Sequence, residues 1–500
     1  MTKEATQSEQ EQGIAGGDND KKASRQGSGR SLKSSKSSNM KGAQPTSTAS
    51  LPLASTQQRR IRAEDSDWSL ETVPLLNELA VKHIVQNFEH NSQILHNLPE
   101  KHKRKVLDSI STNIPLKVTA LLVDYEGYWK RCCQARWQKT TGDVSLFGNS
   151  WKRMYFEWNL QEIIENFVPG TTDETELNET MKLSSSFIRR LDIKQLLPPV
   201  KEAPKGPDSE DLSDGEDSES VDGNEIDHFD FELVMKQLPH LEEFHVTYGV
   251  KNCGMNFEWG LFQFTARDCL LLAKCIAACK TLKVFRIHKS KVDDDKIRVL
   301  ISHLLDHPGL VQLDLSHNII SDRGARAIGK FLNNHSQLVK LNLCDNNIRA
   351  AGAQAIAHAL TKNTTLTDLN LRMNRLADEG GQAICRALLK NETLLDLNLG
   401  SNDLTEPTAT FLAQVLMENK VLNSVDLSCN RLGPDGGKQL QEGMEENNTV
   451  TEMDLRLTDC GQESEYCIQQ ILSRNKERKR HLEETLPQTP NAQQEDNNAM

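Results

Sequence analysis

The 500-residue sequence lacks the apolar segments that mark membrane and secreted proteins. No run approaches the ~18 consecutive apolar residues that a membrane-spanning helix needs, and no apolar core of a secretory signal peptide lies near the start. The eleven cysteines are odd in number, scattered and without a C-x-x-C pair. We therefore expect no membrane insertion, and we expect unpaired thiols in the reducing environment of the cytoplasm.

The sequence also lacks motifs that would mark an enzyme or a cofactor site. The nearest match to a phosphate-binding loop is "GARAIGKF", residues 324–331, but Phe331 stands where that loop needs a serine or threonine. Cys269, Cys275 and Cys279 share one apolar helical stretch that contains no histidine, so its pattern does not indicate a metal site. We expect a protein that is not an enzyme, with no cofactor and no metal.

A basic surplus is absent as well. The formal net charge is −12. We expect no nucleic-acid partner, because the nucleic-acid backbone needs a basic lining and the outward strand positions described below are mostly acidic. Residues 207–227 contain ten acidic and no basic side chains, and we interpret 200–228 as a solvated acidic insert. The alternatives are a docking strip for a basic partner or a phosphorylation switch at Ser213, which acidic residues follow.

Residues 1–60 have the opposite balance, with ten basic and five acidic residues in a Ser-, Gln- and Gly-rich composition. We expect a disordered leader, for which the alternatives are a soluble tail or a contact with the acidic surface of tubulin. Residues 61–186 predict a small helical domain. Its four tryptophans are interpreted as core, with an aromatic partner site as the alternative: Trp129, Trp137, Trp151 and Trp158.

From residue 282 onward, a 28-residue repeat dominates the sequence. Its leading apolar residues follow one another without insertion or deletion: Leu282, Leu310, Leu338, Leu366, Leu394, Leu422 and Val450. Each unit reads L-x-x-L-x-L-x-x-N-x-L and then turns helical, which is typical of a leucine-rich repeat. We predict an α/β horseshoe over residues 187–472 with a parallel sheet on its concave face. Residues 450–472 form its capping repeat, and a C-terminal tail covers 473–500.

Two sets of polar positions accompany the leucines. An asparagine at the end of each strand is expected to bond the backbone of the turn; these ladder residues are Asn318, Asn346, Asn374, Asn402 and Asn430. Outward strand positions form a polar, mostly acidic concave surface about 30 Å long, which suits a protein segment. The candidate binding residues are Asp314, Lys340, Asp368, Asn370, Arg372, Asp396, Asn398, Asp426, Glu452 and Asp454.

Two further recurrences receive local explanations. Gly324, Gly352, Gly380 and Gly436 lie near the helix starts, where we expect a tight strand-to-helix crossover to need glycine. Asn363, Asn391 and Asn447 open N-x-[ST] triplets in the turn before a strand. We interpret them as ordinary polar turn residues that carry no glycan.

The order of these parts, with repeats worded "LVKLNLCDNNI" and "LLDLNLGSNDL", resembles the dynein regulatory complex subunit 5 family. The resemblance implies a component of the nexin-dynein regulatory complex, which links outer doublets and restrains dynein-driven sliding in motile cilia and sperm flagella. It further implies a cytoskeletal location in the axoneme and other subunits of that complex as partners. The alternative is a leucine-rich-repeat regulator of a small GTPase, of the GTPase-activating type, or another cytosolic adaptor.

Overall fold

The computed structural model describes residues 75–138, 143–199, 228–256, 259–333 and 336–485, and all of these belong to one compact unit that begins at Pro74. The predicted leader, Ser213 and nearly all of the acidic insert lie outside the described residues. Among the described residues, no helix combines the length and apolar character needed to cross a bilayer.

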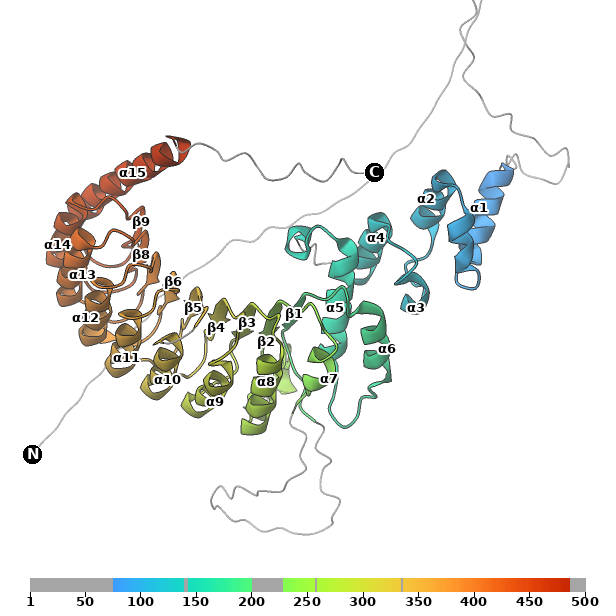
Figure 1. The fold of residues 1–500 in the computed structure, drawn as a ribbon, viewed down its shortest axis with the longest axis horizontal. Coiled ribbons are helices and arrows are strands. Elements are labelled where there is room, and N and C mark those ends of the chain that lie inside the picture. Colours follow the sequence, from blue (N-terminus) through green and yellow to red (C-terminus); the bar gives the residue numbers. More distant parts are fainter. Residues whose placement is uncertain (1–74, 139–142, 200–227, 257–258, 334–335, 486–500) are drawn as a thin grey trace, which may run out of the picture. The chain divides into compact units, whose positions relative to one another are not determined.

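The N-terminal part of this unit is helical (Figure 1). Its tryptophans are buried or half-buried. Trp129 is fully buried and its indole nitrogen donates to the Val123 carbonyl at 2.8 Å. Trp137 and Trp158 are half-buried and meet edge to face, with ring centroids 5.2 Å apart. The elements are α1 (Leu76–Gln86), η1 (Ser92–Asn97), α2 (Glu100–Ser109), α3 (Leu116–Thr119), α4 (Glu126–Arg136), η2 (Val144–Phe147), α5 (Trp151–Glu165) and α6 (Thr175–Ser184).

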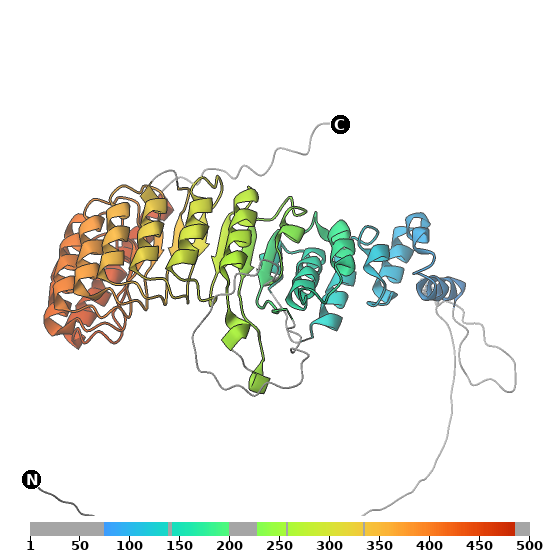
Figure 2. The ribbon, with the colours of Figure 1, turned by 90° about the horizontal axis from the view of Figure 1, so that it is seen from below.

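The rest of the unit is a nine-stranded parallel sheet whose strands lie in chain order. The strands form one face and the helices the other (Figures 1 and 2), as the alternation of leucine and polar residues in each short strand requires. The predicted leucine-rich-repeat horseshoe is thus confirmed. The strands are β1 (Arg190–Ile193), β2 (Glu243–Val246), β3 (Val284–Ile287), β4 (Gln312–Asp314), β5 (Lys340–Asn342), β6 (Asp368–Asn370), β7 (Asp396–Asn398), β8 (Ser424–Asp426) and β9 (Glu452–Asp454).

Each crossover between strands from β3 onward contains a helix. In Figure 2 these helices lie side by side across one face. The helices of the repeat region are α7 (Glu232–Met235), α8 (Ala266–Ala278), α9 (Asp294–Leu304), α10 (Asp322–Asn333), α11 (Ala350–Leu360), α12 (Ala377–Leu388), α13 (Glu406–Glu418), α14 (Gly433–Glu445) and α15 (Gln462–Thr485), with short 3-10 turns η3 (Gly254–Asn256) and η4 (Trp259–Phe262) before α8.

The recurrent glycines have a different cause from the one inferred from sequence. None of the four has a positive φ angle. A Cβ at Gly352 would lie 2.7 Å from a carboxylate oxygen of Asp322 and 3.0 Å from the Ala325 methyl, and both belong to the preceding helix. The glycines therefore permit close contact between neighbouring helices, and their backbone could be adopted by any residue.

The strand-end asparagines form a buried ladder that joins each repeat to its neighbours. Asn374 is 5% exposed, and its Nδ2 donates to the carbonyls of Leu343 and Leu371 at 2.9 and 3.0 Å. Its Oδ1 accepts from the Ile348 amide at 3.1 Å. Leu343 and Ile348 belong to the preceding repeat, so one side chain satisfies backbone groups of two repeats.

A second asparagine ladder lies at the other end of the strands. Its members recur every 28 residues and are all buried: Asn363, Asn391, Asn419, Asn447 and Asn475. Asn391 Nδ2 donates to the Leu360 carbonyl of the previous repeat at 2.8 Å, and its Oδ1 accepts from the Leu394 amide at 2.8 Å. Our interpretation of Asn363, Asn391 and Asn447 as ordinary polar turn residues therefore missed their role.

The last member of this second ladder, Asn475, lies beyond the predicted C-terminal boundary at Leu472. Asn475 is 1% exposed and donates to the carbonyls of Asn447 and Val450 at 3.2 and 2.9 Å. It lies within α15, which continues 13 residues beyond Leu472. The horseshoe therefore does not end at Leu472, because packed and hydrogen-bonded residues follow it.

Replacing a residue of the first ladder should destabilise the protein. In Asn374→Leu, the carbonyls of Leu343 and Leu371 and the Ile348 amide lose a buried partner, at a cost on the order of 1–3 kcal/mol. Chemical denaturation would measure this loss. Asn97→Leu, at an exposed position, is the control. Equal stabilities of the two variants would contradict the structural role of the ladder.

A second prediction concerns α15. Ending the chain after Leu472 leaves the carbonyls of Asn447 and Val450 without the Asn475 amide, which should lower stability by about 1–3 kcal/mol. Ending it after Thr485 should preserve stability. The single substitution Asn475→Ala should reproduce most of the loss in a thermal melt, and an unchanged melting temperature would contradict the assigned docking of α15.

Candidate protein-binding face

The outward strand positions form two rows across β4 to β9. The first row is Gln312, Lys340, Asp368, Asp396, Ser424 and Glu452, and the second row is Asp314, Asn342, Asn370, Asn398, Asp426 and Asp454. Neighbours within a row are register partners on adjacent strands, because equivalent residues of consecutive repeats are 28 residues apart in the sequence. A shallow hollow of about 320 Å³ lies over both rows between β4 and β8.

The second row ends the strands. One side-chain oxygen of each member accepts a hydrogen bond from the amide two residues later; for Asn370 this donor is the Arg372 amide at 3.0 Å, and for Asn398 it is the Gly400 amide at 3.0 Å. Asp454 does the same with the Arg456 amide at 3.0 Å and also pairs with the Arg456 guanidinium. These local turns explain why Asn and Asp occupy every position of this row.

Asp314 corrects the predicted set of binding residues. It is only 2% exposed and forms an ion pair with Arg286, with 2.7 Å between Nε and Oδ2. Burial alone would raise the pKa of Asp314, but hydrogen bonds from Ser316 and the charge of Arg286 hold it below its usual value. The strand pattern placed this residue outward without showing that Arg286, from β3, would cover it.

The first row carries the more accessible charges. Lys340 Nζ lies 2.9 Å from a carboxylate oxygen of Asp368, which neutralises that pair. Asp396 follows on β7 and has no ion-pair partner within the described residues. Burial raises the pKa of Asp396 above its usual value, and the Asp368 carboxylate raises it further, while Lys340 opposes the shift. Asp396 is therefore the uncompensated charge of this row.

Helix α15 forms a wall beside the last strands. Lys476 Nζ lies 3.4 Å from Glu452, and Lys479 Nζ donates to the Asn423 side chain at 3.1 Å. A hollow of about 610 Å³ lies between β7, β8, β9 and α15. The acidic part of the first row is thus bounded by Lys340 at one end and by lysines of α15 at the other.

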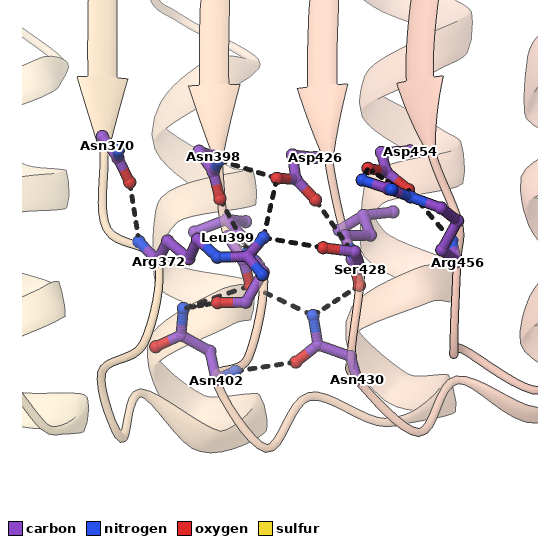
Figure 3. A network of polar contacts seen from close by, with 12 residues as sticks. Asn370, Arg372, Asn398, Leu399, Asn402, Asp426, Ser428, Asn430, Asp454 and Arg456 are labelled. Carbon is purple, nitrogen blue, oxygen red and sulfur yellow. Dashed lines mark hydrogen bonds and ion pairs between the residues drawn. The ribbon is translucent and has the colours of Figure 1, made fainter. Parts of the chain in front are cut away.

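One arginine crosses the face between strands that are not adjacent. Arg372 follows β6, and its Nη1 donates to Asp426 at 3.1 Å and to the Ser428 hydroxyl at 2.8 Å, both of the β8 repeat (Figure 3). Gly400 occupies the equivalent place in the β7 repeat, and a Cβ there would lie 2.9 Å from Arg372 Nη1. Because Gly400 has no side chain, Arg372 can extend across it. The sequence analysis did not identify Gly400.

The structure also places the sequence segments that resemble chemical motifs. Residues 324–331 lie within α10 and form no loop between a strand and a helix. The three cysteines of the α8 region are unpaired and buried. In the described parts of the chain, no group of three or more His, Cys, Asp or Glu side chains is arranged to hold a metal ion.

Comparisons with known proteins agree with this architecture. The family model described as "Leucine Rich repeat" matches residues 309–329, 335–357, 362–385 and 418–440. A mouse protein named dynein regulatory complex subunit 5 is 50% identical over 274 residues, which are 55% of this chain and 54% of that protein. The predicted resemblance to this family is confirmed.

Other relatives carry the same name. The human dynein regulatory complex subunit 5 is 51% identical over 277 residues, which are 55% of this chain and 54% of the human protein. The protein from Chlamydomonas reinhardtii is 31% identical over 225 residues, which are 45% of this chain and 50% of that protein. The chain spans about half the length of the curated relatives it matches.

The raised pKa of Asp396 gives a pH-dependent prediction. Because the folded-state pKa lies above the unfolded value, the ionised carboxylate destabilises the fold, and this cost is present above the folded pKa and absent at acidic pH. Asp396→Asn should therefore raise the melting temperature at pH 7, and the gain should shrink as the pH falls. Differential scanning fluorimetry across the pH range checks this, with Glu442→Gln on the exposed face of α14 as control. A gain that is constant with pH would contradict the assignment.

Proposed function

We propose that this protein is a non-enzymatic scaffold subunit of a dynein regulatory complex and acts in the axoneme of motile cilia and flagella. There it would bind other subunits of the complex that links outer doublets and restrains dynein-driven sliding. Three relatives that bear the name of this subunit, from a mammal to a green alga, support the proposal. The leucine-rich repeats supply a surface suited to protein binding.

The observation that carries the proposal at residue level is the first row of the concave face. Six adjacent strands, β4 to β9, present it over about 24 Å at roughly 4.8 Å per strand. It contains an acidic centre, with Asp396 uncompensated, between lysines at both ends. A basic helix or extended segment of another subunit would complement this centre.

Binding through the first row assigns different roles to the two rows. The second row holds the strand ends in place through its hydrogen bonds to the backbone. Lys340, Asp368, Asp396 and Glu452 would then be the residues that contact the partner. Arg372 and Asp426 would position the surface, because they are bonded to one another.

A contact between the basic leader and tubulin is a separate part of the proposal. The leader has ten basic and five acidic residues, and tubulin presents an acidic surface. Because these residues lie outside the described part of the chain, their charge alone supports this contact. Cytoskeletal location would follow from either interaction.

The central test is charge reversal on the first row. Asp368 and Asp396 are register partners on neighbouring strands, so the double change to lysine replaces attraction of a basic partner with repulsion. We expect the variant to fold and to lose co-purification with other regulatory-complex subunits from flagellar extracts by about tenfold or more. Circular dichroism would establish folding, and quantitative mass spectrometry would measure recovery.

The matched control is Glu392→Lys with Glu418→Lys. Both side chains are exposed, and the double change alters the net charge by the same amount. This control should co-purify as the unchanged protein does. If the first-row variant retained its partners, the binding site would lie elsewhere; recovery of a small GTPase in place of axonemal subunits would favour the alternative function.

A further inference from the structure

Helix α8 has a flank that its neighbours in the array do not have. Helices α8 to α14 are 11 to 13 residues long, and from α9 onward each packs beside the helix before it. Among the described residues of the β1–β2 crossover, only α7 is helical, and it has four residues. In Figure 1 this short helix lies beside α8. One turn of helix cannot cover the flank that a full helix covers in the other repeats.

A groove lies along this flank. Its volume is about 440 Å³, and its walls come from α7, the turn after it, α8 and the residues after α8. Leu271, Cys275 and Ala278 follow one another at helical spacing along α8, so they form a stripe along the groove. Met235 and Leu238 form the opposite wall and are mostly buried, at 6% and 2% exposed. The stripe and the wall are apolar, as in grooves that accept the apolar face of a helix.

The rim of this groove is basic. Lys236, Lys274 and Lys280 line it and are exposed, and Glu232 is its one acidic lining residue. Glu232 pairs with Lys236, which leaves Lys274 and Lys280 as the rim charges without an ion-pair partner among the described residues. Lys280 Nζ donates only to the Ala277 carbonyl, at 2.7 Å, among the contacts of the described residues. The rim therefore has the opposite sign to the acidic centre of the concave face.

We infer that this groove, between α7 and α8, is a second docking site and that it binds an amphipathic helix with acidic flanking residues from a partner protein. The apolar stripe at helical spacing fits the apolar side of such a helix, which would lie where a full repeat helix packs elsewhere in the array. Lys274 and Lys280 would pair with its acidic residues. A nucleic acid would not use the apolar floor, because its affinity comes from phosphate contacts.

This site is independent of the concave face. Its residues belong to the helical side of the array, and none is shared with the two strand rows. A scaffold with an acidic face and a basic-rimmed groove could hold two partners of opposite charge simultaneously.

Fluorescence anisotropy with designed peptides tests the inference on the full chain. The probe is a peptide with leucines at i, i+3, i+4 and i+7 and glutamates at the flanking positions; two further peptides carry glutamine or lysine there. We expect affinity to fall from glutamate to glutamine to lysine. Ala278→Trp, which fills the groove, and Lys274→Glu with Lys280→Glu should each weaken binding of the glutamate peptide by about tenfold or more.

Lys362→Glu with Lys390→Glu is the matched control, because these exposed lysines follow repeat helices, as Lys280 does, but lie outside the groove. It should leave the affinity unchanged. Equal binding of the three peptides, or full binding by the Ala278→Trp variant with its fold verified by circular dichroism, would overturn the inference. A gain in affinity on deletion of residues 206–226 would overturn it too, since the chain's own acidic insert would then be the occupant.

Discussion

The fold depends on the satisfaction of backbone groups that lie between repeats. Each strand has only three or four residues, so the sheet alone leaves the amides and carbonyls of the turns without partners. Two ladders of buried asparagines supply those partners. Asn374 bonds carbonyls in its own and the preceding repeat. At the opposite strand end, Asn391 bonds two carbonyls of the preceding repeat, those of Leu360 and Asn363. This geometry recurs at a constant spacing of 28 residues from Asn318 to Asn430. The acidic insert lies before Asn318, the first asparagine of either ladder among the described residues.

The same constraint determines which side chains remain for binding. Strands this short must end abruptly, and the second outward row ends them by accepting hydrogen bonds from the backbone. The side chains of the first row do not accept these backbone hydrogen bonds, so strand termination does not determine their charges. The ionised Asp396 is unfavourable for stability, because its burial and, after that, the neighbouring Asp368 carboxylate raise its pKa. A surface that retains a destabilising carboxylate beside another one is typical of a binding surface, where the partner supplies the compensating charge.

Much of the fold could be predicted from sequence because the same 28-residue pattern occurs seven times. The leucine positions, the first ladder and the outward rows follow from periodicity alone. Contacts between residues of different repeats could not be predicted, because periodicity does not show which side chains cross from one repeat to another. Arg286 covers Asp314, and Arg372 passes over Gly400 to reach the β8 repeat. The second ladder was missed for another reason. Three of its members open N-x-[ST] triplets, which we interpreted as polar turn residues, and Asn475 lies inside a helix.

The two ends of the repeat array are closed in different ways. The C-terminal closure contributes to stability, whereas the N-terminal closure leaves a helix flank that the fold does not need to cover. At the C-terminal end, α15 inserts Asn475 into the second ladder and places lysines beside Glu452, so the last strand is closed and its acidic charge is partly balanced. Near the N-terminal end, the helical region packs on β1 through α5. Among the described residues of the β1–β2 crossover, the four-residue α7 is the one helix beside α8. Closing the sheet there does not require covering that helix, because the backbone of α8 is satisfied internally. An apolar flank can therefore persist without a backbone cost, and a partner helix could occupy it without disturbing the ladders on which the fold depends.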